Sequence, residues 1–184
     1  MRLLLLLLLP LGYAAVVDRV AVVIDKKVIT ESEVLDDLRL TEFINNQPLN
    51  LGPAARRAAA EHMVDQELVR QDMENSGYPQ PAATEADTLL RKFRQDRFHS
   101  PAEYRAALAK YGITEDQLKQ RLLWQLTAIR FTDQRFPSPQ PENAQSADRA
   151  APGAGAAGVD QQMDAWLKQA RANSKITFKQ EAFQ

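Results

Sequence analysis

Few side chains in this sequence could carry acid–base, nucleophilic or metal chemistry. There is no cysteine, and the two histidines are His62, in the middle of an expected helix, and His99, at the start of another. Neither histidine has a companion set of residues with the spacing of a metal site or a proton relay. Carboxylates are plentiful but fall where helix caps and solvated helix faces explain them, and no glycine-rich phosphate loop occurs. We therefore expect no enzymatic activity, no metal and no cofactor, and infer function from architecture and compartment.

The charge balance excludes two classes of partner. The 23 basic and 24 acidic residues leave a net charge of −1. This gives no basic footprint for nucleic acid. Lys and Arg are spread along every helix, so a membrane-surface helix is not expected either. Without cysteine there is no disulfide framework, and packing alone must stabilise the fold.

The first residues have the pattern of an export signal. Arg2 supplies a positive start, residues 3–9 and Leu11 form an apolar run, and small residues precede a cleavage site near Ala14 or Ala15. The run is too short for a bilayer, which takes about 20 apolar residues, and this disfavours the alternative of a retained anchor. The pattern predicts that residues 1–14 are a cleaved signal peptide and that the mature chain is soluble and exported, with no stable membrane anchor.

The elements that must position any binding surface start with a β-hairpin. Residues 20–29, VAVVIDKKVI, are two β-prone runs separated by Asp25, Lys26 and Lys27. A lone hairpin is marginal in water and needs a third strand. Only residues 175–179, KITFK, offer one. We therefore expect the two ends of the mature chain to meet in one small sheet.

Five helices are predicted after the hairpin, each from its start signal. A capping box at Thr30 and Glu33 begins a helix over about 31–44, and Pro53 begins a second helix that runs to Asn75. The later start signals are Thr84 with Asp87, Ser100-Pro101-Ala102-Glu103 and Thr114-Glu115-Asp116-Gln117, and the predicted C-caps are Gly77 and Gly112. The residues expected to face inward on the fifth helix are Leu122, Leu126 and Ile129.

The last third of the chain contains a break in this pattern. Residues 137–158 are rich in Pro, Ala and Gly and contain no large apolar residue, which predicts a flexible linker. Helical periodicity resumes over 159–173, with Met163, Trp166 and Leu167 on one side. We expect a mainly α-helical fold with a small β-sheet, in which residues 15–136 and 159–184 form a single domain.

Several segments together resemble a known family. They are DRVAVVIDKKVITESEV, AEHMVDQELVRQ, TEADTLLRKFRQ and HSPAEYRAALAKYGITEDQLKQRL, followed by the terminal helix and strand. As a set they are similar to the N-terminal domain of SurA-type periplasmic chaperones of outer-membrane proteins, and similar modules occur in PrsA-type foldases and trigger factor. The resemblance implies a helical body completed by the returning C-terminal helix and strand. Better-known members insert parvulin-type prolyl isomerase domains where this chain has residues 137–158, so isomerase activity is expected to be absent.

Binding of unfolded, aromatic-rich proteins follows from that resemblance as the leading hypothesis. The chain would be an ATP-independent periplasmic holdase with an apolar client surface. Candidate client contacts lie around the loop after the first helix and on the later helices: Phe43, Ile44, Leu49, Leu51, Tyr104, Tyr111 and Trp124. The alternative for each of these residues is a place in the core, and for the two loop leucines a place tucked under the loop.

Two other hypotheses stay open at this point. One is an enzymatic activity, a prolyl isomerase or a hydrolase, for which the residues offer no supporting constellation. The other is an assembly module in which two chains exchange the C-terminal helix and strand, since a long linker permits swapping into a homodimer. Monomer and swapped dimer are both compatible with the sequence.

Overall fold

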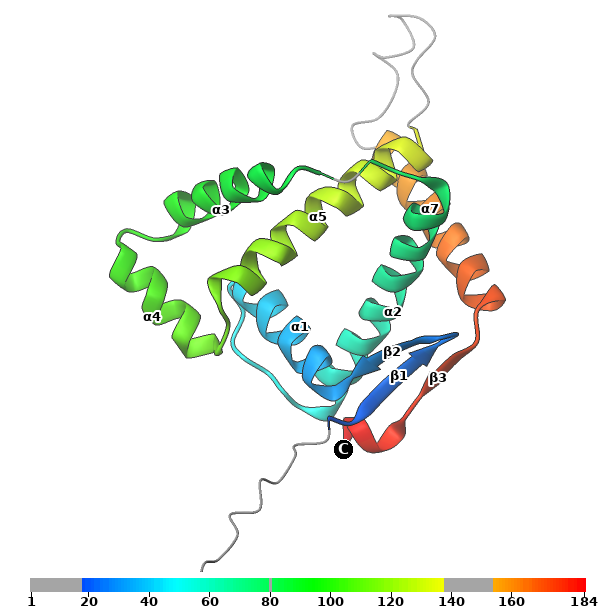
Figure 1. Ribbon diagram of the computed structural model, residues 1–184, viewed down its shortest axis with the longest axis horizontal. Coiled ribbons are helices and arrows are strands. Elements are labelled where there is room, and N and C mark those ends of the chain that lie inside the picture. Colours follow the sequence, from blue (N-terminus) through cyan, green and yellow to red (C-terminus); the bar gives the residue numbers. More distant parts are fainter. Residues whose placement is uncertain (1–17, 80, 138–153) are drawn as a thin grey trace, which may run out of the picture.

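The chain folds mainly into helices, with one small antiparallel sheet (Figure 1). The computed structural model describes residues 18–79, 81–137 and 154–184, with side chains in the last range described from residue 158. The elements are β1 (Val20–Ile24), β2 (Lys27–Thr30), α1 (Glu31–Ile44), α2 (Pro53–Ser76), α3 (Ala83–Arg97), α4 (Pro101–Tyr111), α5 (Glu115–Arg135), α7 (Ala154–Asn173), β3 (Ile176–Phe178) and a 3₁₀ turn η1 (Gln180–Phe183). None of these described helices combines the length and the apolar character that crossing a bilayer requires.

The sheet joins the two ends of the described chain, as predicted. Its order is β2-β1-β3, with β1 antiparallel to both neighbours, and Val22 lies opposite Phe178. Asp25 takes the left-handed conformation, φ 51°, in the hairpin turn, which Asp tolerates better than most residues. Its carboxylate also accepts a 2.9 Å hydrogen bond from the backbone N–H of Lys175, so one residue both turns the hairpin and anchors the returning strand.

Most of the predicted helix ends are confirmed. Thr30 and Thr114 form capping boxes with Glu33 and Gln117 at the starts of α1 and α5. Ser100 caps α4, where its hydroxyl accepts from the N–H of Glu103 at 3.2 Å. The predicted C-caps, Gly77 and Gly112, both lie in the left-handed region, with φ 65° and 66°, which glycine adopts without steric cost.

Two helices start earlier than predicted. The N-cap of α3 is Ala82 rather than Thr84, because the carboxylate of Glu85 reaches back to accept from the N–H of Ala82 at 2.9 Å. Helix α7 begins at Ala154 instead of residue 159, so the end of the predicted linker is helical. Ala154, Ala156 and Ala157 favour helix in this stretch, whereas Gly155 and Gly158 oppose it. The rest of that linker, 138–153, and the predicted signal peptide lie outside the described residues.

The prediction for the inner face of α5 is wrong in its second half. Leu122 is buried, but Ile129 is 58% exposed, and Thr127 and Phe131 are buried instead. The first half of α5 packs on α1, α3 and α4, whereas Phe131 packs on α2 and α7. The buried face therefore moves around the helix, and Ile129 is left exposed.

Three separate hydrophobic clusters hold α1, α2 and α5 together in pairs. The sheet cluster joins α1 to α2, with Val34 and Val64 among its members, together with the strands and η1. The aromatic cluster joins α1 to α5 and to the α3–α4 pair, through residues such as Phe43 and Leu118. The α7 cluster joins α2 to α5 around Phe131, and α7 packs against it. Because each pair of helices meets at a different corner, the middle of the triangle they form in Figure 1 lies between the clusters.

Candidate functional site

Cavities lined by α1, α2 and α5 form a cleft between these helices. It consists of three adjoining cavities of about 510, 680 and 460 Å³. The first lies between α2, α5 and α7, the second between α1, α2 and the loop after α1, and the third between α1, α2 and α5. The first and third cavities share Gln66, Arg121 and Trp124, and the first and second share His62. We call these three cavities together the central cleft.

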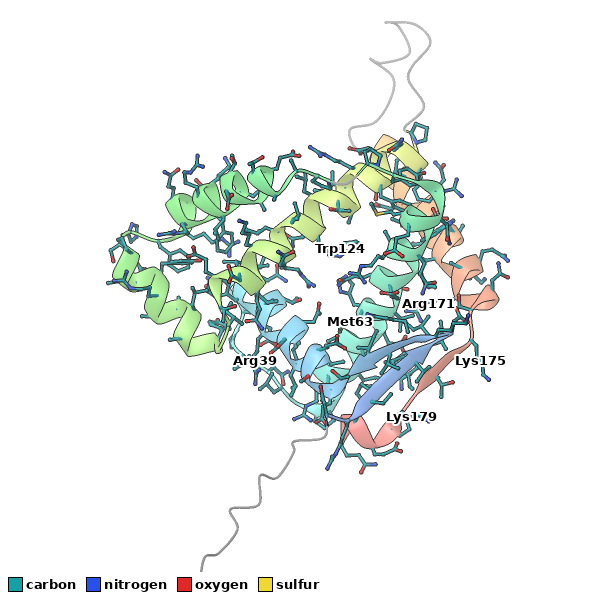
Figure 2. The ribbon with its side chains drawn as sticks, viewed as in Figure 1. Arg39, Met63, Trp124, Arg171, Lys175 and Lys179 are labelled. Atoms are coloured by element: carbon teal, nitrogen blue, oxygen red, sulfur yellow. The ribbon has the colours of Figure 1, made fainter. Side chains whose placement is uncertain are left out.

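The apolar wall of the central cleft comes from four helices, α1, α2, α5 and α7. In Figure 2, Trp124 is labelled between α5 and α2, and Met63 is labelled below it, between α1 and α2. The other large apolar side chains that line it are Leu38, Leu40, Val69, Ile129, Met163 and Leu167. Met side chains are flexible and polarizable and adapt to differently shaped partners. Such a wall offers an apolar chain a surface without demanding one fixed shape.

A buried ion pair fixes α5 against α1 beside this wall. The guanidinium of Arg121 pairs with Asp37, and the side chains of both residues are less than a tenth exposed. Arg121 also donates to the hydroxyl of Thr41 at 2.6 Å. A charge removed from water needs such partners for its hydrogen bonds, and here every partner is on α1. The pair therefore fixes the separation of the two helices.

The indole of Trp124 contacts the cationic side chain of Arg70 on α2. The guanidinium of Arg70 lies 4.8 Å from the ring centroid, within the range of a cation–π contact. Arg70 in turn pairs with Glu67 at 2.5 Å. The indole is thus positioned by α2, although it projects from α5.

An arginine fork docks α7 against α2 and so brings Met163 and Leu167 to the cleft. Arg171 donates to Asp65 at 2.6 Å and to the carboxylate of Glu61 at 2.9 Å. Partial burial acts to raise the pKa of Glu61, but hydrogen bonds from Arg171 and Arg57 outweigh it and lower this pKa below its ordinary value. The fork is therefore present when Glu61 is ionised.

The two histidines of the chain lie apart, one in the central cleft and one outside it. The histidine in the cleft, His62, is exposed and lies 2.8 Å from the side-chain amide of Gln66. His99 lies on another side of the molecule, at the start of α4. Within the described ranges no group of three or more His, Cys, Asp or Glu residues could hold a metal ion. The arrangement is suited to binding through shape and apolar contact.

The seven residues proposed from the sequence as client contacts lie in different environments in the structure. Trp124 lines the central cleft. Phe43 and Tyr104 are 5% and 2% exposed, so their rings belong to the core and are not offered to a partner. The ring of Phe98 lies between them, with centroids 6.1 Å from Phe43 and 5.3 Å from Tyr104. Burial, together with the nearby carboxylate of Glu115, raises the pKa of the Tyr104 hydroxyl.

The remaining four residues lie around the loop that follows α1. Ile44 and Tyr111 are half-buried against the aromatic cluster, and the Tyr111 hydroxyl donates to the carbonyl of Gln47 at 2.7 Å. Leu51 packs under the loop on the sheet cluster. Leu49 is 41% exposed and lies outside the cavities of the central cleft. Of the two loop leucines, Leu51 is thus tucked under the loop, whereas Leu49 is exposed.

Sequence reasoning missed most of the cleft residues. The pair of Arg121 with Asp37 spans a separation of 84 residues, and no local pattern announces it. Met63 and Leu167 look from the sequence like ordinary core positions on amphipathic helices. The one available signal was the excess width of the apolar stripe on α5, where Trp124 extends it beyond what one neighbouring helix can cover.

Comparisons of this chain with models of known protein families and with curated proteins found no match to either.

Proposed function

We propose that this protein is an ATP-independent holdase that binds unfolded segments of exported proteins in the central cleft. The export pattern of the first residues and the resemblance to the N-terminal domain of SurA-type chaperones support this proposal from the sequence. On this basis the compartment is the periplasm, and the clients include outer-membrane proteins. Clients would leave by mass action, without a nucleotide.

The observation that carries the proposal is the open, apolar centre of a helical body whose walls are fixed. Trp124, Met63 and Ile129 line the cleft and leave part of their surface free, with Ile129 58% exposed. One buried ion pair and three separate clusters hold the surrounding helices. Covering such a surface removes apolar area from water, which favours binding of an unfolded chain, and a preformed wall adds little ordering cost on the side of this protein.

A light-scattering assay with cleft variants tests the proposal. An outer-membrane porin is diluted from urea into buffer with an equimolar amount of this protein, and scattering reports porin aggregation. We expect the wild type to suppress aggregation, and the double variant Trp124→Ala, Ile129→Ser to lose most of that suppression. Neither side chain is fully buried, so the variant should stay folded, which circular dichroism checks.

Leu49→Ser is the matched control. Like Ile129, Leu49 is an exposed aliphatic residue, but it lies outside the cleft, and its variant should suppress aggregation as the wild type does. Failure of the wild type to suppress aggregation at equimolar amounts would refute the holdase proposal. If the Leu49 variant loses as much suppression of aggregation as the double variant, the cleft is not the binding surface.

The second candidate function is an assembly module that exchanges its C-terminal elements with a second copy. The observation that favours it is the long sequence separation of the tail contacts: Arg171 binds Glu61 and Asp65, and β3 pairs with β1. The same contacts could form between two chains. A monomer mass by light scattering across micromolar concentrations would remove this candidate.

A further inference from the structure

Around the central cleft, every basic side chain has an ion-pair partner, whereas several acidic side chains have none among the described residues. We propose that, if the cleft binds unfolded chains as argued above, it selects apolar segments flanked by lysine or arginine over those flanked by aspartate or glutamate. This inference rests on the proposed function and names its client class. It concerns the charged residues that flank the apolar segment of a client.

Acidic residues outnumber basic ones along the cleft. The acidic side chains that line the three cavities are Glu33, Asp36, Asp37, Glu42, Asp65 and Asp116, and the basic ones are Arg70 and Arg121. Six negative charges and two positive charges leave a local balance of −4, with His62 neutral. The whole sequence carries only −1, so the cleft is far more acidic than the chain as a whole.

Ion pairs already use every cation in this set. Within the described ranges, Arg70 pairs with Glu67, and Arg121 pairs with Asp37. Two more of the lining carboxylates are neutralised by arginines outside the cavities, Asp36 by Arg39 at 3.0 Å and Asp65 by Arg171 at 2.6 Å. No lining cation is therefore left for an acidic client.

Three lining carboxylates have no cationic partner within 4.0 Å among the described residues: Glu33, Glu42 and Asp116. The carboxylate of Glu33 accepts only from its own helix cap, and that of Glu42 accepts from the N–H of Asn50 at 2.6 Å. Hydrogen bonds from neutral donors leave the negative charge in place. These three residues are thus available to pair with client cations.

Their positions match the apolar wall. Glu33 and Asp116 line the same cavity as Trp124 and Met63, and Glu42 lines the neighbouring cavity. A client side chain that rests on Trp124 therefore shares its cavity with the carboxylates of Glu33 and Asp116. Charges within about 10 Å interact appreciably at 0.1 M salt, so cationic flanks are attracted and acidic flanks repelled. The cleft carboxylates thus repel acidic clients as well as attract cationic ones.

Fluorescence anisotropy with three labelled peptides tests this selection. The peptides share one apolar, aromatic core sequence and differ only in their flanking residues, which are Lys, Gln or Glu. We expect the order of affinity Lys, then Gln, then Glu, with about a tenfold difference between the extremes at low salt. The difference should fall to less than about twofold in 1 M NaCl, because salt screens exposed charges.

Two charge-matched triple variants locate the effect. Glu33→Gln, Glu42→Gln, Asp116→Asn neutralises the unpaired cleft carboxylates, and we expect it to bind the three peptides alike. Glu74→Gln, Asp133→Asn, Glu181→Gln removes the same charge from exposed positions outside the cleft and should keep the wild-type order.

The outcomes distinguish this inference from the proposed function. Equal binding of the Lys and Glu peptides by the wild type, or an unchanged order in the cleft variant, overturns the inference and leaves the holdase proposal standing. If no peptide binds at any salt concentration, the proposed function fails and the inference fails with it.

Discussion

Arg121 is the side chain on which the geometry of the cleft depends most. It lies where two of the cavities meet and bonds to both Asp37 and Thr41 on α1. Replacing a buried ion pair with apolar residues is often neutral, but removing one partner leaves an uncompensated buried charge. The pair is therefore a fixed spacer between α1 and α5 and carries little of the net stability.

This predicts an asymmetric result for substitutions. Arg121→Met should lower the free energy of unfolding by about 3 kcal/mol, because Asp37 stays buried without a partner. The double variant Asp37→Asn, Arg121→Met should recover part of that loss. Urea denaturation monitored by circular dichroism measures both values.

Arg39→Met is the control for Arg121. It breaks the pair with Asp36, whose side chain is 40% exposed, and should cost less than about 1 kcal/mol. A similar small cost for Arg121→Met would show that its pair is not buried in solution.

At the scale of elements, the sequence predicts what is decided locally. The capping boxes at Thr30 and Thr114 depend on residues three positions apart, and both were found where the pattern put them. The third strand was also recognisable, since alternation of Ile176 and Phe178 with polar residues is typical of a half-buried strand. The wrong cap on α3 shows the limit, because a reaching Glu85 outweighed the hydroxyl of Thr84.

The site itself could not be read from local pattern. Ile129 has the spacing of a core residue, but its burial depends on which helix packs beside the second half of α5. The cleft exists because three helices meet pairwise at three corners, and that depends on contacts between distant segments. Trp124 was named as a candidate contact, whereas its neighbours in the cleft were not.

The docking of α7 on α2 should weaken in acid. The pKa of Glu61 is lowered in the folded protein, so its ion pairs contribute fully above the ordinary value of 4.5 and are lost as the pH falls through the lowered value. Arg171→Met should therefore destabilise the protein by about 1 kcal/mol at pH 7 and by less at pH 3. Thermal unfolding of the variant and the wild type at both pH values measures the difference.

Lys168→Met serves as the control on the same helix. Lys168 is exposed and has no ion pair among the described residues, so its loss should have little effect at either pH. A cost of Arg171→Met that stays constant from pH 7 to pH 3 would contradict the proposed role of Glu61.

At the scale of the whole molecule, the C-terminal tail closes the core that the first strand begins. Phe183 is 7% exposed within the sheet cluster, and the N–H of Lys179 donates to the carbonyl of Ala21 at 2.8 Å. The labelled Lys175 and Lys179 lie along the outer side of the sheet in Figure 2, while the apolar residues between them face the helices. The tail is thus a structural part of the body that frames the cleft.

Phe183→Ala should reduce stability by about 3 kcal/mol, since it deletes a buried aromatic side chain and leaves a cavity. The exposed neighbour Lys179 provides the comparison, and Lys179→Ala should change stability by less than about 0.5 kcal/mol. The midpoints of urea unfolding measure the change in stability of both variants. A Phe183 variant as stable as the Lys179 variant would show that the tail does not unfold together with the body.

The placement of β1 between β2 and β3 has a consequence for how the protein is made. A ribosome releases the amino end first, so residues 20–30 leave it long before residues 176–178 are synthesised, and the contact between Asp25 and Lys175 spans 150 residues. Until then one edge of β1 is bare, and bare strand edges recruit other strands. A chain cut short before Ile176 lacks the strand that covers this edge of β1. We therefore expect incomplete copies to aggregate more readily than complete ones.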